Sequence, residues 1–233
     1  FLLLGSLGLS YEFEDKLLLP IGTIYDTFIQ RGLDAFNYAL YSGAKFILVG
    51  TPSGITLSPE GGAHQSIVSA SIGLEMPDVV AYEPCFAHEV EWILLDGLRN
   101  IADREQGRST YLRLSTRPID QSLLPPKWMQ EPESIHHLRQ SVLAGGYCLI
   151  NYRTQPNYDI EDNVVNIFAC GAVVSEAVEA SRALVSEGIY ANVYIITSPD
   201  AIYSNYVKAR SQEMGRVGQG PVCHLHQIVP DSD

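Results

Sequence analysis

Two short segments carry the side chains best suited to chemistry, and the first of them spans residues 24–32. Here Tyr25, Phe28 and Arg31 follow one another at intervals of three residues, so that they line up on one side of a helical turn. Aromatic rings in such a row can stack on a flat heterocycle, and an arginine can pair with a carboxylate or a phosphate. The same spacing is equally typical of an aromatic stripe that packs into a core.

The second segment, residues 58–66, reads SPEGGAHQS and places His64 directly after a glycine turn. It follows the apolar run 45–50, which is typical of a strand buried on both faces. Open parallel sheets bind ligands beyond the carboxyl ends of their strands, and glycines there let the backbone approach a bound molecule closely. Because an imidazole titrates near neutral pH, His64 is a candidate for acid–base catalysis or ligand contact. A structural role is the alternative.

The composition narrows the classes of protein to which the chain can belong. Its 233 residues, 46% of them hydrophobic, suffice for a full core in one or two domains. A formal net charge of −12 argues against nucleic-acid binding, which requires a basic face. No cysteine pair has a Cys-x-x-Cys spacing, and no apolar run approaches the roughly 18 residues of a membrane span. We therefore expect a cytoplasmic protein with reduced thiols and no membrane or nucleic-acid partner.

Hydrophobic periodicity predicts the elements that position the candidate residues. The pattern favours helices over residues 27–42 and 86–101, and strands over residues 45–50, 79–82 and 110–115. Strands that alternate with helices in this way are typical of a parallel sheet with helices on its faces.

A second unit of the same kind follows. Strands are predicted over residues 164–170 and 191–197, and the helix between them begins near a capping Ser175 and stops before Gly188. The predicted fold class is therefore α/β with two parallel-sheet units, and the strand–helix–strand connection is expected to be right-handed.

The segment between the two units is interrupted by prolines, and we expect residues 121–145 to form a linker that runs over the surface. The predicted domains are then residues 1–120 and residues 146–233. His136 and His137 lie in this linker, but two adjacent histidines cannot both face one metal ion from a helix or a strand. No metal site is expected in this chain.

Four segments of the first half occur in a specific order: IYDTFIQRGLDAF, GAKFILVGTPSGITLSPEGGAHQS, PDVVAYEPCFAHEVEWILLDGL and TYLRLSTRPI. Together they resemble the middle, pyrimidine-binding domain of thiamine-diphosphate enzymes of the transketolase superfamily. Transketolases carry His-Asp-Ser where Pro52 and Ser53 stand here, so the chain looks more like the first, decarboxylating component of homodimeric pyruvate dehydrogenases. Residues 163–206 resemble the carboxy-terminal domain of the same dehydrogenases.

The resemblance implies roles for the two candidate segments. Tyr25 would lie against the aminopyrimidine ring of thiamine diphosphate, with Phe28 close by. His64 would be the catalytic residue that faces the substrate carbonyl. Glu60 and Gln65 would support the loop that carries it, with Arg31 as a further supporting residue.

The resemblance also implies the reaction and its partners. The enzyme would decarboxylate a small-molecule 2-oxo acid, pyruvate in the first place, and transfer the acetyl group to the lipoyl arm of an acyltransferase component. The active site would lie between two subunits of a homodimer, with a magnesium ion and the cofactor diphosphate bound outside this segment. A glutamate that activates the cofactor is expected upstream of Phe1, and the family's Gly-Asp-Gly motif does not occur in the sequence. We therefore expect the chain to be an internal piece of a longer enzyme and to bind the cofactor weakly, if at all, when isolated.

Two alternatives stay open. A transketolase or deoxyxylulose phosphate synthase would need cations for sugar phosphates, and Arg113 and Arg117 could supply them. A non-catalytic transketolase-like module would instead serve assembly or regulation.

Overall fold

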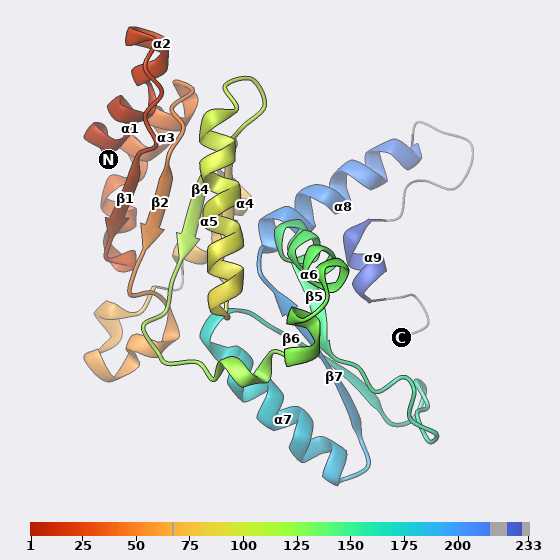
Figure 1. Cartoon of the computed structure of the whole chain (residues 1–233). Helices are drawn as coiled ribbons and strands as arrows, with labels where there is room; N and C mark the ends of the chain where they lie inside the picture. The colour runs from red at the N-terminus through yellow and green to blue at the C-terminus, as the bar shows by residue number, and fades with distance from the viewer. Residues whose placement is uncertain (67, 215–222, 230–233) are drawn as a thin grey trace. The chain divides into compact units, whose positions relative to one another are not determined.

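The computed structural model describes residues 1–66, 68–214 and 223–229. The chain divides into two compact units, Phe1–Pro118 and Ile119–Asp233, each with its own sheet (Figure 1). The predicted α/β fold class is confirmed.

The sheet of the first unit is parallel, and its four strands lie in the order β1-β2-β4-β3. The strands are β1 (Ile21–Ile24), β2 (Ile47–Gly50), β3 (Val79–Tyr82) and β4 (Ser109–Arg113). All residues of β2, β3 and β4 are buried, and continuous apolar runs indicated β2 and β3 in the sequence. The half-exposed edge strand β1 was not anticipated, because it has no such run.

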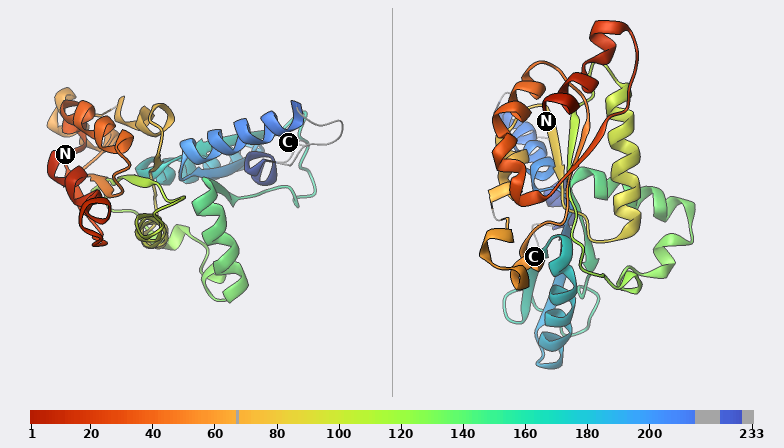
Figure 2. Two further views of the ribbon diagram at one scale, coloured as in Figure 1. Left: turned by 90° about the horizontal axis from the view of Figure 1, so that it is seen from above. Right: turned by 90° about the vertical axis from the view of Figure 1, so that its left-hand side faces the viewer.

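Helices cover both faces of this sheet, with α1 and α3 on one side and α5 on the other (Figure 2). Helix α3 (Leu33–Tyr41) contributes to the core cluster that contains Leu48. The neighbouring Ile47 points to the opposite face, since side chains alternate along a strand. There α5 (Ala87–Ala102) approaches closely, because a Cβ on its Gly97 would lie 3.0 Å from Ile47 Cδ1.

The predicted helix over residues 27–42 is interrupted, and this is a correction to the sequence analysis. Its first part is the 3₁₀ segment η1 (Asp26–Gly32), and only the second part is the α-helix α3. In a 3₁₀ turn the side chains at i and i+3 eclipse one another. Asp26 and Ile29 are therefore both buried, whereas Tyr25 and Phe28 remain partly exposed.

Shorter segments complete the first unit. They are α1 (Leu2–Gly8), α2 (Ser10–Glu14), α4 (Ile72–Glu75), η2 (Ile55–Glu60), η3 (Gly62–His64) and η4 (Val68–Ser71). The last three follow β2 and form the loop on which His64 lies.

The sheet of the second unit has the order β5-β7-β6. Strands β6 (Val164–Ala169) and β7 (Tyr190–Ile196) are parallel and are joined through η7 (Gly171–Val173) and α7 (Val174–Ser186), so the predicted strand–helix–strand unit is present. Strand β5 (Gly146–Ile150), which the sequence did not suggest, pairs with β7 in the antiparallel direction. Ser175 was wrong as the helix cap, because α7 begins one residue earlier without a side-chain cap.

Residues 121–145, expected to be a surface linker, instead contain three helical segments. These are η5 (Gln121–Leu123), η6 (Pro126–Met129) and α6 (Pro132–Ala144). Pro132 occupies the first helical turn, where a missing backbone N–H costs nothing, so this proline starts a helix rather than interrupting one. Leu138 and Val142 bury one face of α6.

The unit ends with α8 (Pro199–Met214) and α9 (His224–Ile228). His224 Nε2 lies 2.7 Å from the carbonyl oxygen of Gly146 in β5, which ties α9 to the sheet. Throughout the described part of the chain, no helix is both long enough and apolar enough to cross a bilayer. The same residues hold no group of three or more potential metal ligands.

Candidate active site

The two candidate segments meet at one edge of the first sheet. Tyr25 follows β1 directly, and the loop that carries His64 follows β2. Since β1 and β2 are parallel neighbours with Ile24 paired to Gly50, both chains leave the sheet at the same edge. In Figure 1 the arrows of β1 and β2 point towards the orange loop segments after β2. This is the edge at which open parallel sheets bind their ligands.

Tyr25 and His64 are in direct contact, although 39 residues separate them in the sequence. The Tyr25 hydroxyl oxygen lies 2.9 Å from His64 Nδ1 and 3.4 Å from Glu60 Oε2. His64 Nδ1 also lies 3.7 Å from Glu60 Oε2, and the side chain of His64 is 44% exposed. Three polar groups that can hold or pass a proton are thus within reach of solvent or a ligand.

The pKa of Tyr25 is raised above its ordinary value, first by desolvation and then by the nearby Glu60 carboxylate and its hydrogen bond. A raised pKa keeps the hydroxyl protonated at neutral pH. Tyr25 can therefore donate its single proton either to His64 Nδ1 or, over a longer distance, to Glu60.

Phe28 and Arg31 extend this site along η1, as the spacing of three residues predicted. The rings of Tyr25 and Phe28 meet edge to face with centroids 5.4 Å apart, and the Arg31 guanidinium carbon lies 4.8 Å from the Phe28 centroid. Phe28 is 44% exposed, so these rings do not form a buried stripe. Gln65 is partly buried and closes the turn through its backbone N–H, which donates to the Gly62 carbonyl at 3.3 Å.

A cluster of buried polar side chains lies beneath the site, and the sequence analysis missed it. Asp26 is 0% exposed. Its carboxylate accepts hydrogen bonds from Ser66, Ser69 and Tyr111. The remaining members are Arg113 and Glu83. A signal was present in the sequence, because an arginine inside the buried strand TYLR needs a partner.

The buried location of Arg113 corrects one alternative from the sequence. Arg113 was a candidate cation for sugar phosphates, but it is 5% exposed and forms ion pairs with Asp26 and Glu83. It is therefore committed to carboxylates inside the protein. Arg117, the other candidate, is exposed.

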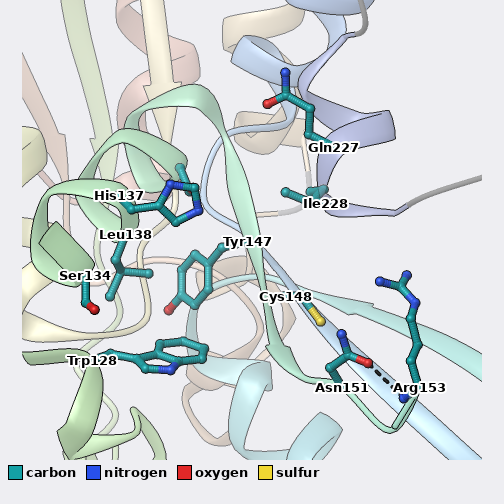
Figure 3. Close-up of a pocket in the computed structure, with 11 residues that line it drawn as sticks. Trp128, Ser134, His137, Leu138, Tyr147, Cys148, Asn151, Arg153, Gln227 and Ile228 are labelled. Carbon is teal, nitrogen blue, oxygen red and sulfur yellow. Dashed lines mark hydrogen bonds between the residues drawn. The ribbon is translucent and has the colours of Figure 1, made fainter.

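A separate cavity of about 410 Å³ lies in the second unit. Figure 3 shows Trp128 and Tyr147 close together at one side of it, and Asn151 and Arg153 at the other. The sulfur of Cys148 also lines it, and burial raises the pKa of this thiol to about 11. The cavity was not predicted, because its lining comes from η6, α6, β5, the segment after β5, and α9.

Comparison with known families bears on the first unit. The family model for the middle domain of the pyruvate dehydrogenase E1 component matches residues 6–117. Residues 6–117 are thus similar to the middle domain of E1 components. The match contains β1 to β4 of the first sheet and every residue of the candidate site.

Pyruvate dehydrogenase E1 components are similar over more of the chain. The pyruvate dehydrogenase E1 component of Mycobacterium tuberculosis is 29% identical over 195 residues, which is 82% of this chain and 20% of the relative. That of Buchnera aphidicola subsp. Schizaphis graminum is 30% identical over 192 residues, or 81% of this chain and 20% of the relative. The chain thus spans about a fifth of the length of the E1 components it matches.

Solved structures agree with the fold. A transketolase from Pichia stipitis aligns with a TM-score of 0.61 at 18% identity, over 83% of this chain and 25% of that one. A transketolase from Leishmania mexicana gives a TM-score of 0.57 at 19% identity, over 80% and 24%. At this identity the likeness shows a transketolase-like fold for the aligned part of the chain and nothing about its function.

Proposed function

We propose that this chain is the pyrimidine-binding part of a thiamine-diphosphate-dependent pyruvate dehydrogenase first component, followed by residues of its carboxy-terminal domain. The enzyme decarboxylates pyruvate and passes the acetyl group to a lipoyl group on an acyltransferase partner. One observation carries the proposal: the contact of Tyr25 with His64 at the carboxyl ends of β1 and β2, in a chain whose relatives are E1 components.

The residues at the site fit a flat, partly polar ring. Tyr25 and Phe28 are partly exposed aromatic rings, and stacking on a heterocycle covers apolar surface that otherwise contacts water. Arg31 already lies over the Phe28 ring, so Tyr25 is the ring better placed for the pyrimidine. When bound, the cofactor supplies the electron sink that decarboxylation requires. Its diphosphate and magnesium ion are bound by residues outside this segment, in a homodimer.

The chain's own contribution is proton transfer and orientation. When Tyr25 donates its proton to His64 Nδ1, the neutral imidazole carries its proton on Nε2 and can donate to a carbonyl oxygen. When Tyr25 donates to Glu60 instead, Nδ1 carries the proton and Nε2 can accept one. The direction of the Tyr25 hydrogen bond therefore favours one neutral tautomer of His64, in which Nε2 either donates to or accepts from a ligand. Passing from one tautomer to the other requires one ring nitrogen to lose a proton and the other to gain one.

Substrate profiling of the complete protein that contains this chain tests the proposal. Pyruvate and a ketose phosphate are offered in turn, each with thiamine diphosphate and magnesium, and with an artificial electron acceptor for the pyruvate assay. We expect turnover of pyruvate that depends on the cofactor. Turnover of the ketose phosphate without turnover of pyruvate would establish the ketol-transferase alternative, and no turnover of either would favour a non-catalytic module.

The isolated 233-residue chain offers a second test. We expect it to bind thiamine diphosphate and magnesium only weakly, because the residues proposed here contact the pyrimidine alone. Isothermal titration measures this, and micromolar affinity would contradict the assignment of the diphosphate site to another segment.

A further inference from the structure

The polar residues beneath the site connect four separate parts of the chain, and Glu83, which directly follows β3, is the one that is only partly buried. We call Asp26, Ser66, Ser69, Tyr111, Arg113 and Glu83 the Asp26 cluster. Asp26 comes from η1, Ser66 and Ser69 come from the loop after β2, and Tyr111 and Arg113 come from β4. Asp26 Oδ2 accepts from Ser69 Oγ at 2.7 Å and lies 3.5 Å from Arg113 Nε.

Each half of the candidate site is attached to this cluster. Asp26 is covalently the next residue after Tyr25, and Ser66 is the second residue after His64. Arg113 Nη2 donates to the backbone carbonyl of Ser66 at 3.1 Å, while Nη1 of the same guanidinium binds Glu83. The cluster therefore joins the backbone of η1 to the backbone of the loop that carries His64.

Few other polar contacts restrain this part of the loop. The backbone hydrogen bonds of His64 and Gln65 go to Gly61 and Gly62, inside the same turn. Among the described residues from 61 to 71, the polar contacts that leave the segment are those of His64 with Tyr25 and Glu60, and those of Ser66 and Ser69 with the Asp26 cluster. The position of His64 relative to Tyr25 thus depends on the cluster.

Because the cluster is charged and largely buried, it favours one position of the loop that carries Ser66 and Ser69. An ionised carboxylate without water is tolerated only when its hydrogen bonds and its cation are in place. Asp26 has three hydroxyl donors and one guanidinium, so a shift of the loop would remove Ser66 and Ser69 from a buried charge. Because such a shift would leave the Asp26 carboxylate without these hydrogen bonds, the cluster holds the loop in its position.

We propose that Asp26 is a positioning residue that sets the contact between Tyr25 and His64. The expected effect of Asp26 on catalysis rests on the function proposed above. Its effect on the contact between Tyr25 and His64 does not. Asp26 itself is fully buried and acts through Ser66 and Ser69 on the loop, and through the backbone on Tyr25.

The test is the ring-nitrogen NMR signal of His64 in Asp26→Asn. The ¹⁵N shift of Nδ1 reports its hydrogen bond to Tyr25, and a spectrum of His64→Gln assigns the signal. Asparagine keeps the size of the side chain and removes its charge. We expect the hydrogen-bonded Nδ1 signal to be lost or split into several signals, while the circular dichroism spectrum stays native.

Glu89→Gln is the matched control. Glu89 is also a buried carboxylate, 1% exposed, and it accepts from the backbone N–H groups of Cys85 and Phe86 at the start of α5. These two contacts lie at the start of α5 and not on the loop that carries His64. We expect Glu89→Gln to leave the His64 signal unchanged.

A folded Asp26→Asn protein with an unchanged His64 signal would overturn the proposal, and so would an equal change in Glu89→Gln. If Asp26→Asn does not fold, Ser69→Ala removes a single donor and should produce a smaller change of the same kind; an unchanged signal there would overturn the proposal as well. In the complete protein, we expect Asp26→Asn to lower kcat for pyruvate more than it changes KM. Because the NMR readout needs no substrate, failure of the pyruvate assay and failure of this proposal can be told apart.

Discussion

Gly50 packs directly against the Asp26 cluster, and Gly50→Ala perturbs this packing. A Cβ at this position would lie 2.4 Å from Asp26 Oδ1 and 3.1 Å from the Tyr111 hydroxyl oxygen. Non-bonded heavy atoms prefer about 3.5 Å or more, so the overlap with Asp26 is about 1 Å or more. Asp26 cannot turn away without losing partners, because it is held by three hydroxyl donors and Arg113.

The size of the effect follows from these contacts. Overpacking of a core costs about 1–3 kcal/mol, and loss of one hydrogen bond to a charged group costs about 1.5–3 kcal/mol. We therefore expect Gly50→Ala to lower the free energy of unfolding of the first unit by about 3 kcal/mol. With a urea dependence of about 2 kcal/mol per molar, the unfolding midpoint would fall by about 1.5 M.

Urea unfolding followed by tryptophan fluorescence measures this change. The chain has two tryptophans, Trp92 in the first unit and Trp128 in the second, so a Trp128→Phe background reports the first unit alone. Gly62→Ala is the control, because a Cβ on Gly62 would meet no heavy atom within 4 Å. We expect the free energy of unfolding of the control to stay within about 0.5 kcal/mol of the parent. Equal midpoints for Gly50→Ala and Gly62→Ala would refute the reasoning.

Three further predictions test separate contacts. Tyr25→Phe keeps the ring and removes the hydroxyl next to His64, so kcat of the complete protein should fall. The affinity for thiamine diphosphate should change less than about tenfold, because a lost hydrogen bond costs about 1 kcal/mol. Burial raises the folded-state pKa of Glu83 above its ordinary 4.5, so this group should make the first unit more stable as pH falls from neutral towards 4.5. Urea midpoints measured against pH should show this dependence, and Glu83→Gln should weaken the dependence. The Cys148 thiol, with a pKa of about 11, is only about 0.1% thiolate at pH 8, so mass spectrometry should find its alkylation by iodoacetamide slow at pH 8 and much faster towards pH 10; rapid alkylation at pH 8 would contradict the assigned pKa.

Local patterns were sufficient for the elements that bury complete apolar runs. Residues 79–82 and the helix over 86–101 were predicted nearly to their ends, because a buried parallel strand is apolar throughout and an amphipathic helix repeats every 3.6 residues. The half-exposed β1 lacks such a pattern. The prolines of residues 121–145 were misread as interruptions, since the sequence does not distinguish a proline that begins a helix from one that ends it.

The sequence by itself determined which two segments carry the candidate site residues, the α/β class and the resemblance to thiamine-diphosphate enzymes. It did so because residue types, short spacings and hydrophobic periods are properties of the chain alone. Only the tertiary structure decided that Tyr25 and His64 are 2.9 Å apart and that Asp26 and Arg113 form a buried ion pair beneath them. Asp26 and Tyr111 are 85 residues apart in sequence, and only the parallel order of β1, β2 and β4 brings such distant residues to one edge of a sheet.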